Sequence, residues 1–183
     1  MSADFMPVIE TNRTILRQLV PADAGELFAY ASDEAVAKYT TWQPHQTVDD
    51  ARQFIQRALE RYAQNIHADW GIIEKATDRL IGTCGFVHVH PHRRAEIGYA
   101  LGRTHWNQGL MSEVVKSVIL YGFKTLQLHR IEARADVRNV GSWRVMEKCN
   151  MTFEGVLRGH LFAKNEFHDV RMYSILVSEL DDP

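Results

Sequence analysis

Apolar residues follow a helical period in the N-terminal third of the chain. After a strand predicted over residues 14–19, apolar side chains recur every three or four positions, as they do in amphipathic helices. Pro21 opens the first of these helices, and a short one follows from Asp33. The clearest helix begins after Thr47, because Asp50 stands three residues later as in a capping box. This part of the chain therefore predicts one strand followed by helices.

The period changes to two in the middle of the chain, which is typical of strands. Residues 70–74 and 80–90 predict an antiparallel pair joined by the polar turn 76–79. After Pro91, residues 94–101 alternate as a third strand. Its two faces carry Ala95, Ile97, Tyr99 and Leu101 on one side and Glu96, Gly98 and Ala100 on the other.

Helices and strands alternate in the last third of the chain. The predicted segments are a helix with Met111, Val114, Val115, Val118 and Ile119 on one stripe, a strand over 130–137, a helix over 140–149, and strands over 153–162 and 167–177. Asn150 suits the left-handed position that ends the second helix, and residues 164–165 form the last turn. Antiparallel strands followed by a β-α-β crossover predict an α/β fold with a mixed, mostly antiparallel sheet and helices on both faces.

Length and composition indicate one packed domain. The chain has 183 residues, of which 45% are hydrophobic and 24% charged, as in ordinary globular proteins. We expect a single domain over residues 1–183, with residues 1–9 and 178–183 frayed. Apolar runs are too short for a membrane helix, and the N-terminus lacks the pattern of a secretory signal. Two cysteines exclude a disulfide framework, so we expect a cytoplasmic protein.

Charge and histidine content argue against two further classes. Lys and Arg number 21 against 23 Asp and Glu, so the basic excess of a nucleic-acid binder is missing. The run His88-Val89-His90-Pro91-His92 resembles a metal site, but zinc needs three or four converging ligands and no carboxylate or cysteine is suitably spaced nearby. We therefore expect no metal and no nucleic acid. The composition favours an enzyme or a small-ligand domain.

One strand, loop and helix form a candidate phosphate cradle. Residues 97–101 lead into the loop that contains Trp106 and Gly109, and a helix follows. The unpaired N–H groups at the start of a helix favour anions, and a glycine lets a ligand approach the backbone. Neither GxxxxGK[ST] nor GxGxxG is present, so nucleotide-binding P-loop and Rossmann sites are excluded. A glycine before a helix more often only shapes a turn.

The surrounding motifs occur in one order and spacing. They are Ala95-Glu96-Ile97-Gly98-Tyr99, Trp106-x-x-Gly109, Glu113, His129-Arg130-Ile131-Glu132-Ala133 and Asn139-x-x-Ser142-x-Arg144-Val145-Met146-Glu147-Lys148. Together they resemble the GNAT superfamily of acetyl-CoA-dependent N-acetyltransferases, and within it the RimJ/RimL branch. Residues 10–17 and 169–174 also look like that branch, so the resemblance covers residues 10–177. It implies a GNAT-like domain that uses acetyl-CoA.

The resemblance implies where acetyl-CoA binds. Its pyrophosphate would sit on residues 108–112, and its pantetheine arm would run beside residues 97–101, which splay from the strand 130–137. A main-chain N–H near Tyr99 or Ala100 would polarise the thioester carbonyl. Asn139 would touch the pantetheine, cap the following helix, or do both. The implied cofactor-binding residues are Tyr99, Ala100, Leu101, Trp106, Asn107, Gln108, Gly109, Leu110, Met111, Ser112 and Asn139.

Two methionines depart from the family pattern. Met111 replaces a glycine or alanine of the loop, and we expect its side chain to point inward and leave its N–H free. Met146 stands where many members place a tyrosine general acid, and a thioether cannot donate a proton. Ser142, one helical turn earlier, is the candidate acid, although a small serine that packs a helix is an equal interpretation.

Glu96 is the candidate base, because an unpaired carboxylate rarely occupies the middle of a covered strand. The competing interpretation is a structural ion pair with an arginine such as Arg134. Trp42 would line the acceptor cleft or seal an edge of the core. Cys84, within a strand, packs rather than acting as a nucleophile.

The cost of deprotonating the acceptor amine favours an α-amine over a lysine side chain. An α-amine with a pKa of about 7.7–8.0 costs about 1–1.4 kcal/mol to deprotonate at pH 7, whereas lysine costs about 4.6 kcal/mol. One weak carboxylate suits the α-amine, for example that of a ribosomal or other protein N-terminus. The alternatives are a small-molecule amine (an aminoacyl compound, a polyamine or an antibiotic) and a non-catalytic acyl-CoA-binding module. The resemblance also makes a homodimer through the late strands plausible.

Overall fold

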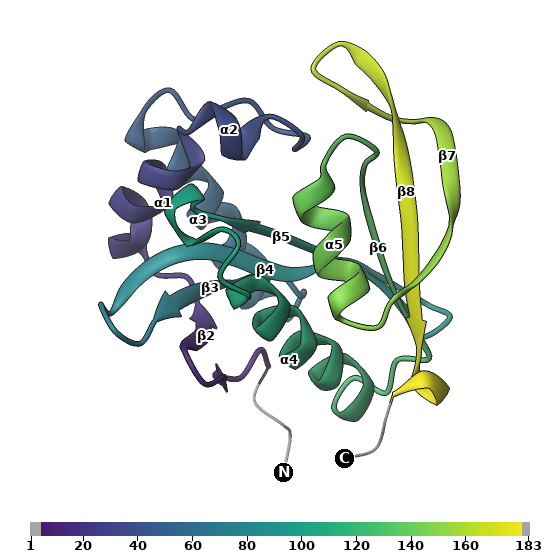
Figure 1. Ribbon diagram of the computed structural model, residues 1–183. Helices are drawn as coiled ribbons and strands as arrows, with labels where there is room; N and C mark the ends of the chain where they lie inside the picture. The colour runs from purple at the N-terminus through teal and green to yellow at the C-terminus, as the bar shows by residue number, and fades with distance from the viewer. Residues whose placement is uncertain (1–4, 181–183) are drawn as a thin grey trace.

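The computed structural model describes residues 5–180, which form one eight-stranded sheet in the order β1-β2-β3-β4-β5-β6-β8-β7 (Figure 1). The strands are β1 Ile9–Glu10, β2 Thr14–Gln18, β3 Asp69–Glu74, β4 Arg79–His90, β5 Arg94–Leu101, β6 Arg130–Asp136, β7 Thr152–Ala163 and β8 Glu166–Leu176. Neighbouring strands are antiparallel except β5 and β6, which are parallel. This confirms the predicted mixed, mostly antiparallel sheet with a central crossover.

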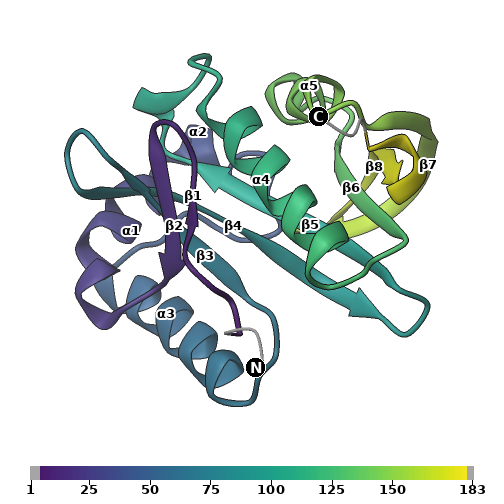
Figure 2. The ribbon, with the colours of Figure 1, turned by 90° about the horizontal axis from the view of Figure 1, so that it is seen from below.

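Helices cover both faces of the sheet. They are α1 Ala24–Ala31, α2 Glu34–Ala37, α3 Val48–Ala63, α4 Leu110–Lys124 and α5 Val140–Lys148, with 3-10 turns η1 Pro21–Asp23, η2 Arg103–His105 and η3 Val177–Glu179. Figure 2 shows α3 and α4 on opposite sides of the central strands. Among residues 5–180, no helix is long and apolar enough to span a bilayer.

Local sequence signals explain where the helices begin and end. The N–H of Thr47 donates to the Asp50 carboxylate at 2.9 Å, so Asp50 satisfies a backbone group at the start of α3. Asn150 has a φ of 60° and lies just beyond α5, as predicted. The apolar stripe of α4 is buried along its length. Packing of that stripe on the sheet fixes the orientation of the α4 N-terminus.

Some of the residues that we expected to fray are packed against the rest of the chain. Residues 1–4 and 181–183 lie outside the described residues. Met6 is only 3% exposed, and the Pro7 carbonyl accepts a hydrogen bond of 2.9 Å from the Trp70 indole. At the other end, Leu180 packs against the core. Residues 5–9 are therefore held in place because an apolar side chain and a backbone acceptor both find partners on β3 or beside it.

Strands β5 and β6 pair over only three positions. The partners are Arg94 with Arg130, Ala95 with Ile131, and Glu96 with Glu132. Beyond Glu96, β5 remains paired with β4 as far as Leu101, while β6 remains paired with β8 as far as Asp136. The two parallel strands therefore diverge towards their C-terminal ends, as the resemblance implied. We call the space between 97–101 and 133–136 the β5–β6 gap.

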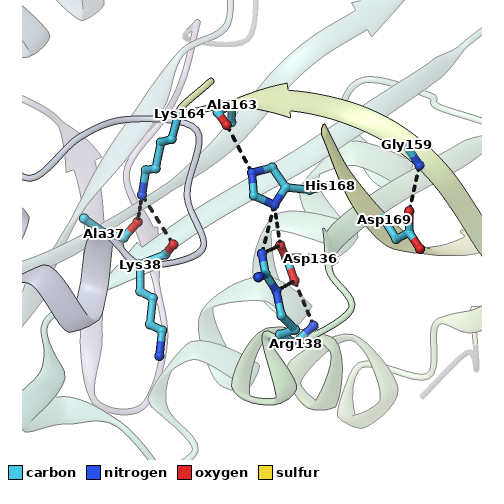
Figure 3. A network of polar contacts seen from close by, with 9 residues as sticks. All are labelled: Ala37, Lys38, Asp136, Arg138, Gly159, Ala163, Lys164, His168 and Asp169. Carbon is cyan, nitrogen blue, oxygen red and sulfur yellow. Dashed lines mark hydrogen bonds and ion pairs between the residues drawn. The ribbon is translucent and has the colours of Figure 1, made fainter. Parts of the chain in front are cut away.

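The β7–β8 hairpin reaches back to the first half of the chain. Lys164, in the two-residue turn of the hairpin, donates from Nζ to the carbonyl of Ala37 at 2.6 Å and that of Lys38 at 3.3 Å (Figure 3). These carbonyls end α2, so the ammonium group satisfies helix-terminal acceptors. Nearby, His168 contacts Asp136 at 3.2 Å, at the end of β6. The hairpin and α2 thus meet near the C-terminal end of β6.

An ion-pair network joins the last three strands of the sheet. Arg130 of β6 donates from Nη1 and Nη2 to both carboxylate oxygens of Glu154 of β7, at 2.7 and 2.6 Å. The Ser174 hydroxyl of β8 donates to Glu154 at 2.5 Å. The Arg130 guanidinium and the Ser174 hydroxyl hold the pKa of Glu154 down at about 2. Glu154 is therefore ionised throughout the neutral and mildly acidic range.

We predict that Glu154→Gln destabilises the fold at pH 7 by about 1 kcal/mol, a value reduced for the partial exposure of this side chain. Because the folded pKa is depressed, the stabilisation is present above the unfolded value of about 4.3 and is lost as the pH falls towards 2. Denaturant unfolding of both proteins between pH 7 and pH 2.5 measures this. A difference that stays constant over that range would contradict the assignment.

Candidate active site

Side-chain hydrogen bonds hold the loop between β5 and α4. The Trp106 indole donates to the Leu101 carbonyl at 2.7 Å, and the Gln108 side-chain amide donates to the Thr104 carbonyl at 2.9 Å. Gly109 has a φ of +78°, a left-handed conformation that glycine adopts without steric cost. The loop 106–109 therefore has a defined shape before any ligand binds.

The N-terminus of α4 presents a set of unpaired backbone donors. The N–H groups of residues 109–112 precede the first hydrogen bond of the helix, which joins the Glu113 N–H to the Gly109 carbonyl at 3.1 Å. Met111 is only 6% exposed, so its side chain points into the core, as expected, and does not cover these donors. The positive end of the helix dipole lies at the same place. This end of α4 suits an anion.

Glu96 and Arg134 bridge the β5–β6 gap where it opens. Arg134 Nε lies 2.9 Å from Glu96 Oε1, and the two side chains are 27% and 15% exposed. Arg134 Nη1 also lies 2.9 Å from His160 Nε2 of β7. The structural ion pair that the sequence analysis set against a catalytic role for Glu96 is therefore present. Because this ion pair lies at the start of the gap, Glu96 is still a candidate for a catalytic role.

Tyr99 and Ser142 join β5 to α5 on the face of β5 opposite Glu96. The Ser142 hydroxyl donates to the Tyr99 hydroxyl oxygen at 3.2 Å, and the Tyr99 hydroxyl donates to the Ser142 carbonyl at 3.0 Å. Burial raises the pKa of Tyr99 well above its usual value, so the phenol stays neutral. Sequence reasoning considered only the main chain of Tyr99. Successive side chains of a strand point to opposite faces, so Tyr99, three residues after Glu96, lies on the other face of β5, towards α5. This alternation was the signal in the sequence that could have identified the phenol.

The first turn of α5 has a side-chain cap. Asn139 Oδ1 accepts a hydrogen bond from the Ser142 N–H at 3.2 Å, which confirms the capping interpretation of Asn139. Its contact with pantetheine stays a prediction. Met146 is 1% exposed and belongs to the core. The α5 position that carries a tyrosine acid in many family members therefore contributes packing here.

The remaining candidate residues are Trp42, Cys84 and the histidines of the run 88–92. Trp42 is partly buried against the core with its ring centroid 5.7 Å from that of His45, which matches the core-edge interpretation. Cys84 is fully buried, and burial raises the pKa of its thiol well above the usual value. The rings of His88 and His90 lie 6.1 Å apart. Within residues 5–180 no cluster of three or more His, Cys, Asp or Glu side chains could hold a metal ion.

Comparison with known proteins gives a consistent assignment. A family model described as an acetyltransferase (GNAT) domain matches residues 13–152. The uncharacterized N-acetyltransferase p20 of Bacillus licheniformis is 40% identical over 175 residues, 95% of this chain and 98% of that protein. The crystal structure of a GNAT-family acetyltransferase from Bacillus anthracis has a TM-score of 0.84 at 29% identity, covering 93% of this chain and 98% of that one. The ribosomal-protein-serine acetyltransferase of Escherichia coli is 28% identical over 153 residues, 79% of this chain and 84% of that protein.

The chain therefore belongs to the GNAT family of acetyltransferases. It is an enzyme that takes acetyl-CoA as co-substrate and transfers the acetyl group to an amine. The residues present fit this co-substrate, because the open donors of α4 suit phosphates and residues 97–101 of β5 have no register partner on β6.

We predict that Gly109→Ala lowers both the stability of the protein and its affinity for acetyl-CoA. An added Cβ would meet only Arg13 Nη2, at 3.6 Å, so the cost comes from the left-handed backbone and not from a clash. We expect a loss of about 1 kcal/mol in stability and weaker acetyl-CoA binding, measured by thermal unfolding and calorimetric titration.

Gly25→Ala is the matched control, since its added Cβ meets nothing within 4 Å inside α1. The control should bind acetyl-CoA like the wild type and unfold no lower. Equal acetyl-CoA affinity and stability for Gly109→Ala would refute the prediction.

Proposed function

We propose that this enzyme acetylates the α-amine of a protein N-terminus, by direct attack of the amine on the thioester of acetyl-CoA. The observation that carries the proposal is the Glu96–Arg134 pair at 2.9 Å, at the opening of the β5–β6 gap. The similarity to a ribosomal-protein-serine acetyltransferase supports the choice of acceptor. No covalent enzyme intermediate is required, because the thioester is already activated.

Acetyl-CoA would bind along the loop and the gap. Its pyrophosphate would accept hydrogen bonds from the N–H groups of residues 109–112, and its pantetheine arm would lie beside residues 97–101. A main-chain N–H near Tyr99 or Ala100 would donate to the thioester oxygen as negative charge develops on it. The acetyl carbon would then lie near Glu96, where an amine can reach it.

Glu96 would accept a proton from the incoming ammonium group, directly or through a water molecule. The ion pair with Arg134 holds the Glu96 side chain in place, and a carboxylate is a weak base. A weak base suffices for an α-amine, whose deprotonation at pH 7 costs about 1–1.4 kcal/mol, and is poorly matched to lysine at about 4.6 kcal/mol. A carboxylate base therefore favours the α-amine as acceptor.

Ser142 would return a proton to the departing sulfur of CoA. Its hydroxyl lies at the first turn of α5, beside β5, and its hydrogen bond to the Tyr99 hydroxyl at 3.2 Å fixes its orientation. The amine nitrogen forms a bond to the acetyl carbon as the carbon–sulfur bond breaks. Of the two protons that the ammonium group loses, one would leave to solvent by way of Glu96, and the other would replace the proton that Ser142 gives to the sulfur. The products are an acetamide and free CoA.

Two peptides test the acceptor class. We predict that a peptide with a free N-terminal serine or alanine and no lysine reacts faster than its N-blocked, lysine-containing counterpart. Release of CoA with each peptide, confirmed by the mass of the product, measures the preference. Faster reaction of the blocked peptide would contradict it, and reaction of small amines alone would indicate a small-molecule acetyltransferase.

A second prediction concerns the proposed base. Glu96→Gln should lower kcat by about 100-fold while leaving the affinity for acetyl-CoA unchanged, because the carboxylate acts on the amine. Glu132→Gln is the matched control: Glu132 pairs in register with Glu96 and accepts from Arg130 at 2.7 Å, and we expect its kcat to stay within a few-fold.

Steady-state rates with the free-N-terminal peptide, and calorimetric titration of acetyl-CoA, separate the two effects. Equal losses in kcat for both glutamine variants would indicate a structural role for Glu96. Retained acetyl-CoA binding with no turnover of any amine in the wild type would indicate a non-catalytic acyl-CoA-binding protein.

A further inference from the structure

Arg13, between β1 and β2, contacts the start of α4 although about a hundred residues separate them. Its main-chain N–H and its Nε donate to the two carboxylate oxygens of Glu113, each at 2.9 Å. Its Nη1 donates to the Gln108 carbonyl at 2.9 Å. One arginine thus joins the first turn of α4 to the loop that precedes it.

We propose that Arg13 is a positioning residue that sets the direction of the Gly109 N–H in the phosphate-binding loop. The peptide bond between Gln108 and Gly109 is trans, so its C=O and N–H point in opposite directions. Because the C=O is held by Arg13, the N–H points away from Arg13. Glycine tolerates both signs of φ and does not fix this peptide plane by itself, so the arginine supplies the constraint.

Arg13 also counters an unfavourable charge. Glu113 lies in the first turn of α4, close to where the diphosphate would bind, and an unpaired carboxylate there would repel it. The guanidinium and the main-chain N–H of Arg13 engage both of its oxygens. Arg13 Nη1 donates a hydrogen bond to the carbonyl of Gln108. In this role Arg13 orients the peptide of the loop and does not itself bind the phosphate.

This inference rests on the placement of the CoA pyrophosphate at residues 109–112 in the proposed function, and it is independent of the acceptor. The Arg13→Lys variant distinguishes a residue that positions the loop from one that binds phosphate directly. Lysine at position 13 would keep a positive charge but lose the fork that reaches two acceptors at once. If Arg13 positions the loop, lysine at this position will not restore CoA affinity. If Arg13 binds phosphate directly, lysine will restore it.

Calorimetric titrations of CoA and of pantetheine, which lacks phosphates, test the inference. Wild type, Arg13→Met, Arg13→Lys and Arg79→Met are compared. Arg79 is the matched control, because its Nε pairs with Glu26 of α1 at 2.8 Å while a neighbouring main-chain N–H donates to the same carboxylate. We expect CoA affinity to fall roughly tenfold in both Arg13 variants. Pantetheine affinity, and CoA affinity in Arg79→Met, should match the wild type.

Each other result has a distinct meaning. CoA affinity within twofold of wild type in Arg13→Met would overturn the inference, and so would an equal loss for pantetheine. Rescue by Arg13→Lys would make Arg13 a phosphate ligand instead. Wild-type protein that binds CoA no more tightly than pantetheine would refute the phosphate site itself, and with it the role of Arg13.

If Arg13→Met does not fold, Glu113→Gln provides the second test. It weakens one half of the contact and leaves the bond from Nη1 to the Gln108 carbonyl in place. We expect a loss of CoA affinity smaller than tenfold, again with pantetheine affinity unchanged. An unchanged or greater affinity for CoA would contradict the proposed constraint.

Discussion

The early end of β5–β6 pairing is the constraint on which the rest of the structure depends. After three register pairs β5 and β6 separate. Beyond that point β5 stays paired with β4, and β6 stays paired with β8, so each side of the gap is a strand held by its other neighbour. Two side-chain contacts hold β5 on either face: Glu96 pairs with Arg134 of β6, and Tyr99 bonds to Ser142 of α5. Both candidate proton-transfer groups are thereby held at fixed places beside the space that an acyl group and an amine would share.

The two ends of the co-substrate make different demands on the protein. The phosphates need directed N–H groups, which the loop with the left-handed Gly109 and the N-terminus of α4 would supply in the proposed function. The thioester needs a donor, a base and an acid, which β5, β6 and the first turn of α5 can supply. The Lys164 contact joins the β7–β8 hairpin to α2, so segments from both halves of the chain meet near the C-terminal end of β6.

Local patterns sufficed for most elements, because alternation and capping are properties of neighbouring residues. The strand 94–101 and the left-handed Asn150 are examples, and Arg134 was named as an example of an arginine that could pair with Glu96. The hydroxyl pair of Tyr99 and Ser142, the clamp by Arg13 and the packing of Met6 join residues far apart in sequence. Such contacts depend on how far strands diverge and helices approach, which no local pattern encodes.

The central claim is that acetyl-CoA occupies the β5–β6 gap and the start of α4. Amide hydrogen exchange, measured with and without saturating acetyl-CoA, tests this most directly. The account predicts slower exchange in residues 97–101 and 108–112, with little change in α3 and in the edge strand β7. Slower exchange confined to other elements, with those two segments unchanged while binding is confirmed by calorimetry, would contradict it.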